Sequence, residues 1–338
     1  FNYIEHGMGP KWKWLAKIFA FFGIGVGLLG IGTFTQVNGI SSAVNNFFDS
    51  NNAWTVSLFG RTYSWTVVIS CLILTFCVAL VLIGGIQRIS KVAQVIVPFM
   101  AATYFLAGIL IILFNITDVP AAILTIVQSA FGLKAAAGGA LGAMVVAMQK
   151  GIARGIFSNE AGLGSAPIAA AAARTNEPVR QGLVSMTATF IDTIIICSIT
   201  GIAIVLTGAY DMGLEGVAVT TKAFQLGLPF PDGVASFILM LCLVFFAFTT
   251  ILGWDYYSER CLEYLTNGKK KCIKAYRWIY ILCVFIGPYM TVSAVWTIAD
   301  IFNGLMAIPN LIALVALNGV VAKETKDYLD RIKKKEID

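Results

Sequence analysis

Residues 151–167 read Gly-Ile-Ala-Arg-Gly-Ile-Phe-Ser-Asn-Glu-Ala-Gly-Leu-Gly-Ser-Ala-Pro and lie within an otherwise apolar stretch from residue 136 to residue 173. One continuous helix over this stretch would be nearly twice as long as a hydrocarbon core of about 30 Å is thick. The quoted segment holds four glycines, a proline and several polar groups. The sequence therefore predicts a membrane helix that is broken near its middle.

A break of this kind predicts a binding site. Non-helical backbone at membrane depth is tolerated only where protein buries it or where it lines a watery cavity. In transporters a discontinuous helix usually holds the substrate, with the ends of its two halves and their unpaired carbonyls facing ligand and ion.

The composition places the chain in a membrane. Of its 338 residues, 58% are hydrophobic and 12% are charged, whereas roughly 25% are charged in an average soluble domain. Uncharged runs such as 66–86 and 92–117 are long enough to span a bilayer as helices, and the alternating strands of a β-barrel are not seen. We expect an all-α polytopic protein of the plasma (inner) membrane, surrounded by the lipid bilayer.

Several functional classes are disfavoured. The formal net charge of +6 does not predict nucleic-acid binding, because the Lys and Arg residues form short clusters between apolar runs, where basic residues normally fix membrane topology. The seven cysteines lack metal-ligand or disulfide-framework spacing, and His6 is the only histidine. The sequence contains no metalloprotease, nucleophile-elbow or nucleotide-binding motif. It predicts no enzyme, no organic cofactor and no obligate protein partner.

The apolar runs predict eight membrane crossings, near residues 14–48, 65–87, 92–117, 136–173, 182–209, 233–258, 277–294 and 297–322. The linkers between them alternate in charge, as the positive-inside rule requires. One side carries Lys11, Lys13, Arg88, Lys91, Arg174, Arg180, Arg260, Lys269–Lys271 and the tail from Lys323, and the other carries Asp49, Asp118, Asp211, Glu215 and Asp232. The basic side, with the C-terminal tail, is predicted to face the cytoplasm.

The crossing near residues 14–48 is unusually long. A single helix over it would measure about 50 Å, so we expect it to tilt steeply or to protrude from the bilayer. Its glycines at positions 23, 25, 27, 30 and 32 predict close approach of its backbone to neighbouring helices.

The number of crossings predicts a domain plan. The broken helix and the four crossings after it make five, the size of one inverted repeat in many five-plus-five transporters. We therefore expect residues 1–135 to be the remainder of a first repeat, with three transmembrane helices and an extracellular loop, 136–322 to be the second repeat, and 323–338 to be a cytoplasmic tail. On this plan the first two core helices are absent, and because the chain begins at Phe1 instead of Met we expect an N-terminal truncation.

Five stretches resemble, in the right order, motifs of the alanine or glycine:cation symporter family of the amino acid-polyamine-organocation superfamily. They are Gln36–Asn38, the central motif 151–172, Phe190–Cys197, Thr249–Cys261 and Val295–Asn310. The resemblance covers essentially the whole chain. It implies a leucine-transporter-type inverted-repeat fold that imports alanine or glycine by alternating access, coupled to sodium or sometimes to protons. The family's N-terminal aromatic, glycine-rich motif and its first broken helix do not appear in this sequence.

The broken helix and the long helix near the N-terminus supply the first candidate site residues. Freed backbone groups around Ile156, Phe157 and Ser158 are predicted to contact the amino acid, with the side chain of Ile156 or Phe157 limiting the size of the substrate's side chain. The alternative is that the glycines nearby serve only helix packing. Gln36 can donate and accept, so it could bridge the ammonium or carboxylate group of the substrate, or alternatively form an interhelical hydrogen bond.

A second group of candidates follows from Thr249 and Thr250. Their hydroxyl oxygens suit a hard cation and resemble the position at which this fold binds sodium, the one metal ion expected. Their alternative role is to bond carbonyls of their own helix. By the family resemblance, the next turn lines the substrate pocket with Gly253 and Trp254, and Thr250 contributes to it as well.

The remaining candidates are gating or structural residues, namely Arg154, Asn159, Glu160 and Asp192. An intramembrane carboxylate is a functional candidate by default, but Glu160 could instead cap the N-terminus of a half-helix. Arg154 could pair with any of the acidic groups. Asp300 is expected in an outer turn, where it would be merely solvated.

Three kinds of transport remain possible on these observations. Sodium-coupled symport is predicted, and a proton-coupled symporter or a passive facilitator of small neutral amino acids is the alternative. A channel would need a continuous pore with repeated filter elements or rings of charge, and no such repeat is visible in the sequence.

Overall fold

The computed structural model describes residues 1–58, 60–131 and 139–334 and is helical apart from one hairpin. Its first part contains α1 (Lys13–Leu29), α2 (Phe34–Phe48), α3 (Trp65–Ile83), α4 (Gly85–Phe114) and α5 (Val119–Ala130). The hairpin pairs β1 (Thr55–Leu58) antiparallel with β2 (Arg61–Ser64), with Thr55 opposite Ser64. This small sheet lies within the predicted linker between the first two crossings.

The second part contains α6 (Ala140–Asn159), α7 (Ala166–Ala170), α8 (Pro178–Phe190), a π-helical segment (Ile191–Cys197), α9 (Ser198–Leu206), α10 (Val217–Gly227), α11 (Asp232–Thr266), α12 (Lys270–Ile286), α13 (Val292–Ala316) and α14 (Asn318–Lys333). Short helical turns cover Tyr3–Gly7, Pro10–Trp12, Ala209–Asp211 and Gly287–Tyr289. The predicted boundary between the two repeats, at residues 135 and 136, and the last four residues of the predicted tail lie outside the described residues.

Six helical stretches in the described ranges are long and apolar enough to cross a membrane, and they confirm a polytopic helical membrane protein. They are Pro10–Phe48, Trp65–Ile83, Gln87–Phe114, Pro178–Leu206, Asp232–Thr266 and Val292–Ala316. The two other predicted crossings differ. The stretch 136–173 is divided between α6 and α7, and 277–294 corresponds to most of α12, a helix of 17 residues followed by a short turn.

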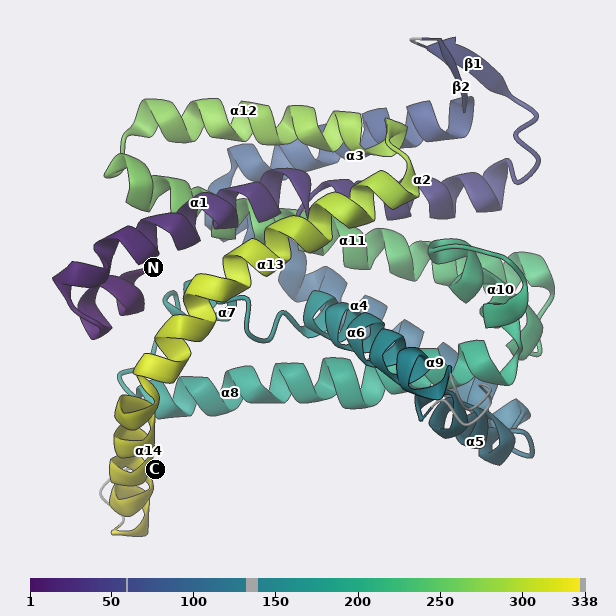
Figure 1. Ribbon diagram of the computed structural model, residues 1–338. Coiled ribbons are helices and arrows are strands. Elements are labelled where there is room, and N and C mark those ends of the chain that lie inside the picture. Colours follow the sequence, from purple (N-terminus) through teal and green to yellow (C-terminus); the bar gives the residue numbers. More distant parts are fainter. Residues whose placement is uncertain (59, 132–138, 335–338) are drawn as a thin grey trace.

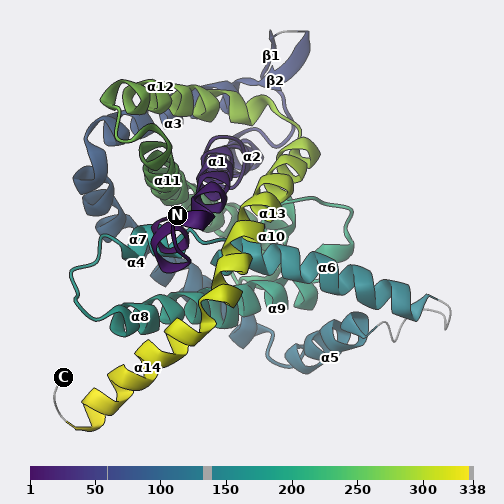
Figure 2. The same ribbon diagram turned by 60° about the vertical axis from the view of Figure 1, so that its left-hand side comes forward.

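The long helix α11 forms the centre of the bundle. It packs against α1, α2, α3, α4, α10 and α12, as Figures 1 and 2 show from two sides. The side chains of Leu239, Ile251, Leu252 and Trp254 on this helix are almost fully buried. Residues on α11 are therefore placed to connect elements that lie far apart in the sequence.

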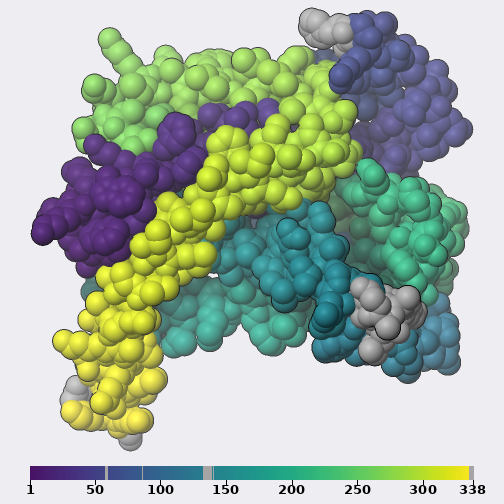
Figure 3. Space-filling model, viewed as in Figure 1, coloured from purple at the N-terminus to yellow at the C-terminus, as the bar shows by residue number. Residues whose placement is uncertain are grey.

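The glycines of α1 allow the close packing that was predicted for them. A Cβ atom added at Gly25 would lie 2.2 Å from the ring of Phe302 on α13, and one added at Gly27 would lie 2.4 Å from Oγ of Ser258 on α11. Helix α1 therefore lies directly against both α11 and α13, and Figure 3 shows α13 crossing this face of the molecule between α1 and α6.

The predicted single helix over residues 14–48 is wrong, because the chain breaks between α1 and α2. Four residues, Gly30 to Thr33, are not helical. The hydroxyl of Thr33 lies 3.1 Å from the carbonyl oxygen of Gly27, and that of Thr35 lies 3.2 Å from the carbonyl oxygen of Ile31. These hydroxyls bond carbonyl groups that the interruption frees, which is how a break can persist at membrane depth. The crossing is thus two shorter helices.

The predicted alternation of linkers between two sides agrees with the arrangement of the helices. Figure 1 shows the N-terminus and α14 at one end of the bundle and the hairpin and α10 at the opposite end. The lysines at the start of α12 lie at the first end, and Asp49 precedes the hairpin at the second. Which end faces the cytoplasm stays a prediction.

Candidate functional site

The predicted break in the helix over 136–173 is confirmed. Helix α6 ends at Asn159, and six residues separate it from the start of α7 at Ala166. Glu160 adopts the left-handed conformation with φ at 56°, and Gly162 and Gly164 follow with φ at 83° and 86°. Positive φ is strained for a residue with a side chain and unstrained for glycine, so the two glycines let the chain leave the helical path within a short segment. We call residues 160–165 the α6–α7 break.

The freed backbone lies slightly later in the sequence than predicted. Ile156, Phe157 and Ser158 all belong to α6, and the carbonyl oxygen of Ile156 accepts the N–H of Glu160 at 2.9 Å. The expectation of a freed backbone at Ile156 is therefore wrong, because the helix continues for three more residues. The carbonyls of the last turn, from Phe157 onward, point out of the C-terminal end of α6.

The α6–α7 break is held by side chains of two other helices. The carboxylate of Glu160 accepts Oγ of Ser165 at 2.5 Å and Nε1 of Trp254, from α11, at 2.9 Å. From α13, Nδ2 of Asn310 donates to the carbonyl oxygen of Gly162 at 2.8 Å. Among the described residues, the carboxylate of Glu160 thus bonds side chains and no backbone N–H of a half-helix N-terminus, so the predicted capping alternative is not observed there.

Trp254 also contacts the break between α1 and α2. A Cβ atom added at Gly32 would lie 2.6 Å from Cβ of Trp254. The hydroxyl of Tyr280, from α12, lies 3.1 Å from the carbonyl oxygen of Gly32 and 2.7 Å from that of Ile251. Trp254, which is 1% exposed, therefore contacts both helix breaks, one through its indole N–H and the other through its Cβ atom.

In the C-terminal half of α6, the charged side chain of Arg154 contacts α13. The guanidinium group of Arg154 lies 2.5 Å from the carboxylate of Asp300 and stacks over the ring of Trp296 at 4.4 Å. Asp300 lies in the third turn of α13, which begins at Val292, and because it pairs with Arg154 the expectation that it is merely solvated is wrong. Of the predicted partners for Arg154, the structure selects Asp300.

The same half of α6 also bonds the π-helical segment. Oγ of Ser158 donates to the carboxylate of Asp192 at 2.7 Å, and Nδ2 of Asn159 donates to the hydroxyl of Thr193 at 2.8 Å. π-Helical turns inside α-helices are frequent at functional sites.

These polar contacts form one partly exposed face. The side chains of Arg154 and Asp300 are 39% and 44% exposed, and Ser158 is exposed as well. Hydrocarbon cannot solvate such groups, so at membrane depth they belong on a surface that water reaches. We call the face formed by Arg154, Ser158, Asp192 and Asp300 the polar face.

Four other predicted site residues take no part in the hydrogen bonds and ion pairs of the polar face among the described residues. They are Gln36, Thr249, Thr250 and Gly253. Gln36 is half-buried near the start of α2, and none of the side-chain hydrogen bonds found among the described residues involves it. The hydroxyls of Thr249 and Thr250 lie 3.0 Å and 2.9 Å from the carbonyl oxygen of Phe246 in the same helix. A Cβ atom added at Gly253 would meet no atom within 4 Å, so space is open beside it.

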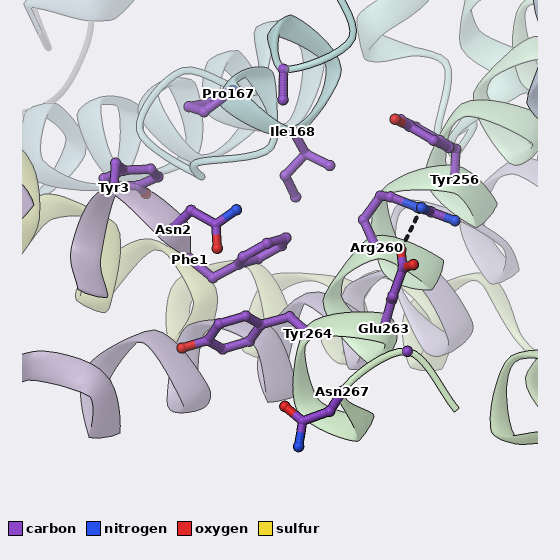
Figure 4. Close-up of a pocket in the computed structure, with 12 residues that line it drawn as sticks. Phe1, Asn2, Tyr3, Pro167, Ile168, Tyr256, Arg260, Glu263, Tyr264 and Asn267 are labelled. Carbon is purple, nitrogen blue, oxygen red and sulfur yellow. Dashed lines mark ion pairs between the residues drawn. The ribbon is translucent and has the colours of Figure 1, made fainter. Parts of the chain in front are cut away.

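A cavity that the sequence did not predict lies beside the α6–α7 break. It has a volume of about 650 Å³ and lies between the N-terminal segment, α7 and the end of α11. Figure 4 shows the rings of Tyr256 and Tyr264, the ion pair between Arg260 and Glu263, and Ile168 of α7 around it. Since aromatic residues are expected in any apolar helix, no pattern in the sequence indicates this cavity.

Several apolar helices of spanning length, with a helix broken among them beside a polar face, define an integral membrane protein of the transporter class. The chain belongs to the sodium:alanine symporter family, whose model matches residues 1–338. This is a family of transporters and not of enzymes.

Curated relatives agree with this assignment. An uncharacterized transporter of Haemophilus influenzae is 51% identical over 333 residues, which cover 98% of this chain and 68% of the relative. The sodium/alanine symporter AgcS of Methanococcus maripaludis is 43% identical, with 98% of this chain and 68% of the relative covered. The probable sodium/glutamine symporter GlnT of Bacillus subtilis is 37% identical, with 96% and 63% covered. The chain thus spans about two thirds of the length of these relatives.

Proposed function

We propose that this protein acts in a secondary active symporter that imports alanine and/or glycine with sodium across the plasma membrane by alternating access. The observation that carries the proposal is the α6–α7 break, which Trp254 connects to a second break between α1 and α2. Discontinuous helices at the centre of a transporter are where substrate and coupling ion bind. Family membership supports the same class of activity.

A zwitterionic substrate needs dipoles at both ends. The carbonyls at the C-terminal end of α6 would face its ammonium group, and Gln36 can donate to its carboxylate. Phe157 lies against Trp296, with ring centroids 4.6 Å apart, and on this proposal it limits the side chain of the substrate together with Ile156. Gly253, Thr250 and Trp254 form the α11 side of the pocket.

Sodium is proposed to bind near Thr249 and Thr250. Each hydroxyl donates a hydrogen bond to a carbonyl oxygen of its own helix, so the lone pairs of the hydroxyl oxygen remain available to a cation. Two of the relatives are named as sodium symporters. A proton as the coupling ion is the second candidate, because one Bacillus subtilis relative, 35% identical, is named a putative sodium/proton-dependent alanine carrier.

Alternating access would use the inverted-repeat plan predicted from the sequence, in which residues 136–322 form the second repeat. The basic end of the bundle, with the C-terminus, is proposed to lie in the cytoplasm. The cavity shown in Figure 4 lies at this end, beside the α6–α7 break, and it would form part of the inner exit path. Arg154, Asn159, Glu160 and Asp192 are proposed to gate or brace this path.

The experiment is uptake of labelled alanine into liposomes that contain the purified gene product in which this sequence occurs. We expect uptake that an inward sodium gradient drives above equilibrium and that unlabelled glycine inhibits. Uptake that depends on a proton gradient and not on the sodium gradient would show that the coupling ion is the proton. Uptake that ignores both gradients would show a passive facilitator and overturn the proposal.

A further inference from the structure

A second cavity lies between α11, α12 and the turn from α3 to α4. It has a volume of about 290 Å³ and shares Tyr256 and Arg260 with the cavity beside the α6–α7 break, but none of the residues of the polar face lines it. Apolar side chains of Leu82 and Ile89 form one wall, and Asp255, Glu259, Arg260 and Arg277 form the other. None of the roles proposed above uses this cavity.

In this cavity, the guanidinium groups of Arg260 and Arg277 both pair with the carboxylate of Glu259. Glu259 is 4% exposed. It accepts Arg277 Nε at 2.6 Å and Arg260 Nη2 at 2.7 Å. Arg260 also pairs with Glu263, as the dashed line in Figure 4 shows. The charge of Glu259 is therefore compensated, and both arginines are already occupied.

Asp255 lies one turn before Glu259 on α11 and lacks such compensation. It is 2% exposed, and its Oδ1 is sealed from water without a hydrogen-bond partner among the described residues. Of the hydroxyls on α12, that of Tyr276 donates to Oγ of Ser258 at 2.5 Å, and that of Tyr280 bonds backbone carbonyls. An ionised carboxylate in this position would be buried without a donor or a free cation.

The groups around Asp255 indicate which of three ligands it can bind: a metal ion, a zwitterion or a proton. A hard metal ion requires several oxygen ligands, whereas the other lining side chains with oxygen atoms are Tyr256 and Glu259, and Glu259 is already bonded to two positively charged guanidinium groups. A zwitterion would need access to Oδ1, which is sealed. A proton needs neither space nor further ligands, and it removes the uncompensated charge.

We propose that Asp255 is a proton-binding site that controls transport: its protonated form, which the structure represents, permits the transport cycle, and loss of the proton slows it. On release, the O–H bond of the carboxyl group breaks and the proton passes to water that enters the cavity when α12 separates from α11. That water then solvates the ionised carboxylate. Asp255 follows Trp254 directly, so this change of charge occurs next to the residue that contacts both helix breaks. This inference rests on the proposed function only where it refers to a transport cycle.

The first test does not depend on transport. Infrared spectra of the wild-type gene product and of its Asp255→Asn variant are compared near neutral pH. We expect the variant to lose one carbonyl stretching band of a protonated carboxylic acid. Asp232→Asn, at the exposed start of the same helix, is the matched control and should keep the band. A spectrum unchanged by Asp255→Asn would overturn the proposal.

The second test measures sodium-driven alanine uptake with equal pH on both sides of the liposome membrane. Wild-type uptake should fall about tenfold between about pH 6 and about pH 8, because one titrating proton changes the protonated fraction by up to about tenfold per pH unit. Asp255→Asn, which imitates the neutral acid, should retain uptake that changes less than about twofold. Asp232→Asn should follow the wild type.

The outcomes separate the two proposals. If Asp255→Asn shows the pH dependence of the wild type, or if the wild type shows none, Asp255 has no part in the cycle and the inference fails. If no protein takes up alanine on a sodium gradient but the infrared band is lost in Asp255→Asn, the proposed function fails while proton binding at Asp255 stands.

Discussion

Trp254 contacts both helix breaks, and a single residue thereby relates two segments that lie far apart in the sequence. Its indole N–H donates to Glu160, and its Cβ lies against Gly32. The family resemblance predicted Trp254 as a pocket residue, but neither contact was predicted. Because a hydrogen bond across 94 residues of sequence depends on the packing of whole helices, no local pattern indicates it.

Gly253, the neighbour of Trp254, provides a test of the proposed pocket. Space is open beside its backbone, so a Gly253→Met variant is expected to fold and to fill part of that space. We expect the ratio of glycine to alanine uptake to rise about tenfold or more, since a single methylene group in a filled pocket commonly changes discrimination by that factor. The measurement is initial uptake of both labelled amino acids in liposomes.

The control for Gly253→Met is Gly182→Met. Gly182 lies on the exposed side of α8, where an added Cβ atom also meets nothing within 4 Å. It should leave the uptake ratio unchanged. An unchanged ratio in Gly253→Met as well would remove Gly253 from the pocket.

At the scale of helices, the packing of α1 on α13 depends on the absence of a side chain at Gly25. The Gly25→Ala variant would place Cβ 2.2 Å from the ring of Phe302, and either that ring would have to shift or the two helices would have to separate. Overpacking of this kind typically destabilises by about 1–3 kcal/mol. We expect a lower midpoint of thermal unfolding in detergent.

Gly39→Ala, in α2, is the matched change for Gly25→Ala. There the nearest atom to an added Cβ is 3.8 Å away, and alanine favours a helix over glycine by up to about 1 kcal/mol. The midpoint should therefore stay constant or rise. Equal midpoints for the two variants would show that α1 and α13 are not in such close contact.

The hairpin is attached to the end of α2 through Asp49. Hydrogen bonds from the hydroxyl of Ser64, at 2.7 Å, and from the backbone N–H of Ala53, at 2.7 Å, lower the pKa of Asp49. Because the folded-state pKa is depressed, this attachment contributes at neutral pH and is lost as the pH falls through that pKa. We expect amide hydrogen exchange at Ala53 and Trp54 to be slower in the wild type than in Asp49→Asn near pH 7.

That difference in exchange should disappear once the pH has fallen through the depressed pKa of Asp49, where the carboxyl group is protonated. Comparing the two proteins at the same pH cancels the intrinsic effect of pH on exchange. A difference that persists unchanged at acidic pH would mean that the charge of Asp49 does not hold the hairpin.

The sequence predicted the elements better than their interruptions. The α6–α7 break was predictable because the stretch was too long and contained four glycines and a proline. The break between α1 and α2 was not, since Gly30 and Gly32 have the same residue type as the packing glycines before them. The π-helical segment at Ile191–Cys197 contains no helix breaker, so nothing in its composition distinguishes it from the flanking α-helices.

For the whole molecule, the two ends of the bundle lead to a prediction of topology. The basic linkers and the C-terminus are proposed to lie in the cytoplasm. In bacteria, a green fluorescent reporter fused after Asp338 should fluoresce, and alkaline phosphatase inserted between Asn51 and Asn52 should be active. An inactive phosphatase together with a dark C-terminal fusion would reverse the orientation.

The packing of α1 against α11 and α13 has a consequence for synthesis in the cell. Roughly 200 residues separate the end of α1 from the start of α11, and a ribosome adds about 5–20 residues per second. Helix α1 therefore waits about 10–40 s in the membrane before its partners exist. During that time its glycine-lined surface faces lipid or the insertion machinery, and the bundle can close only when the C-terminal third of the chain has been inserted.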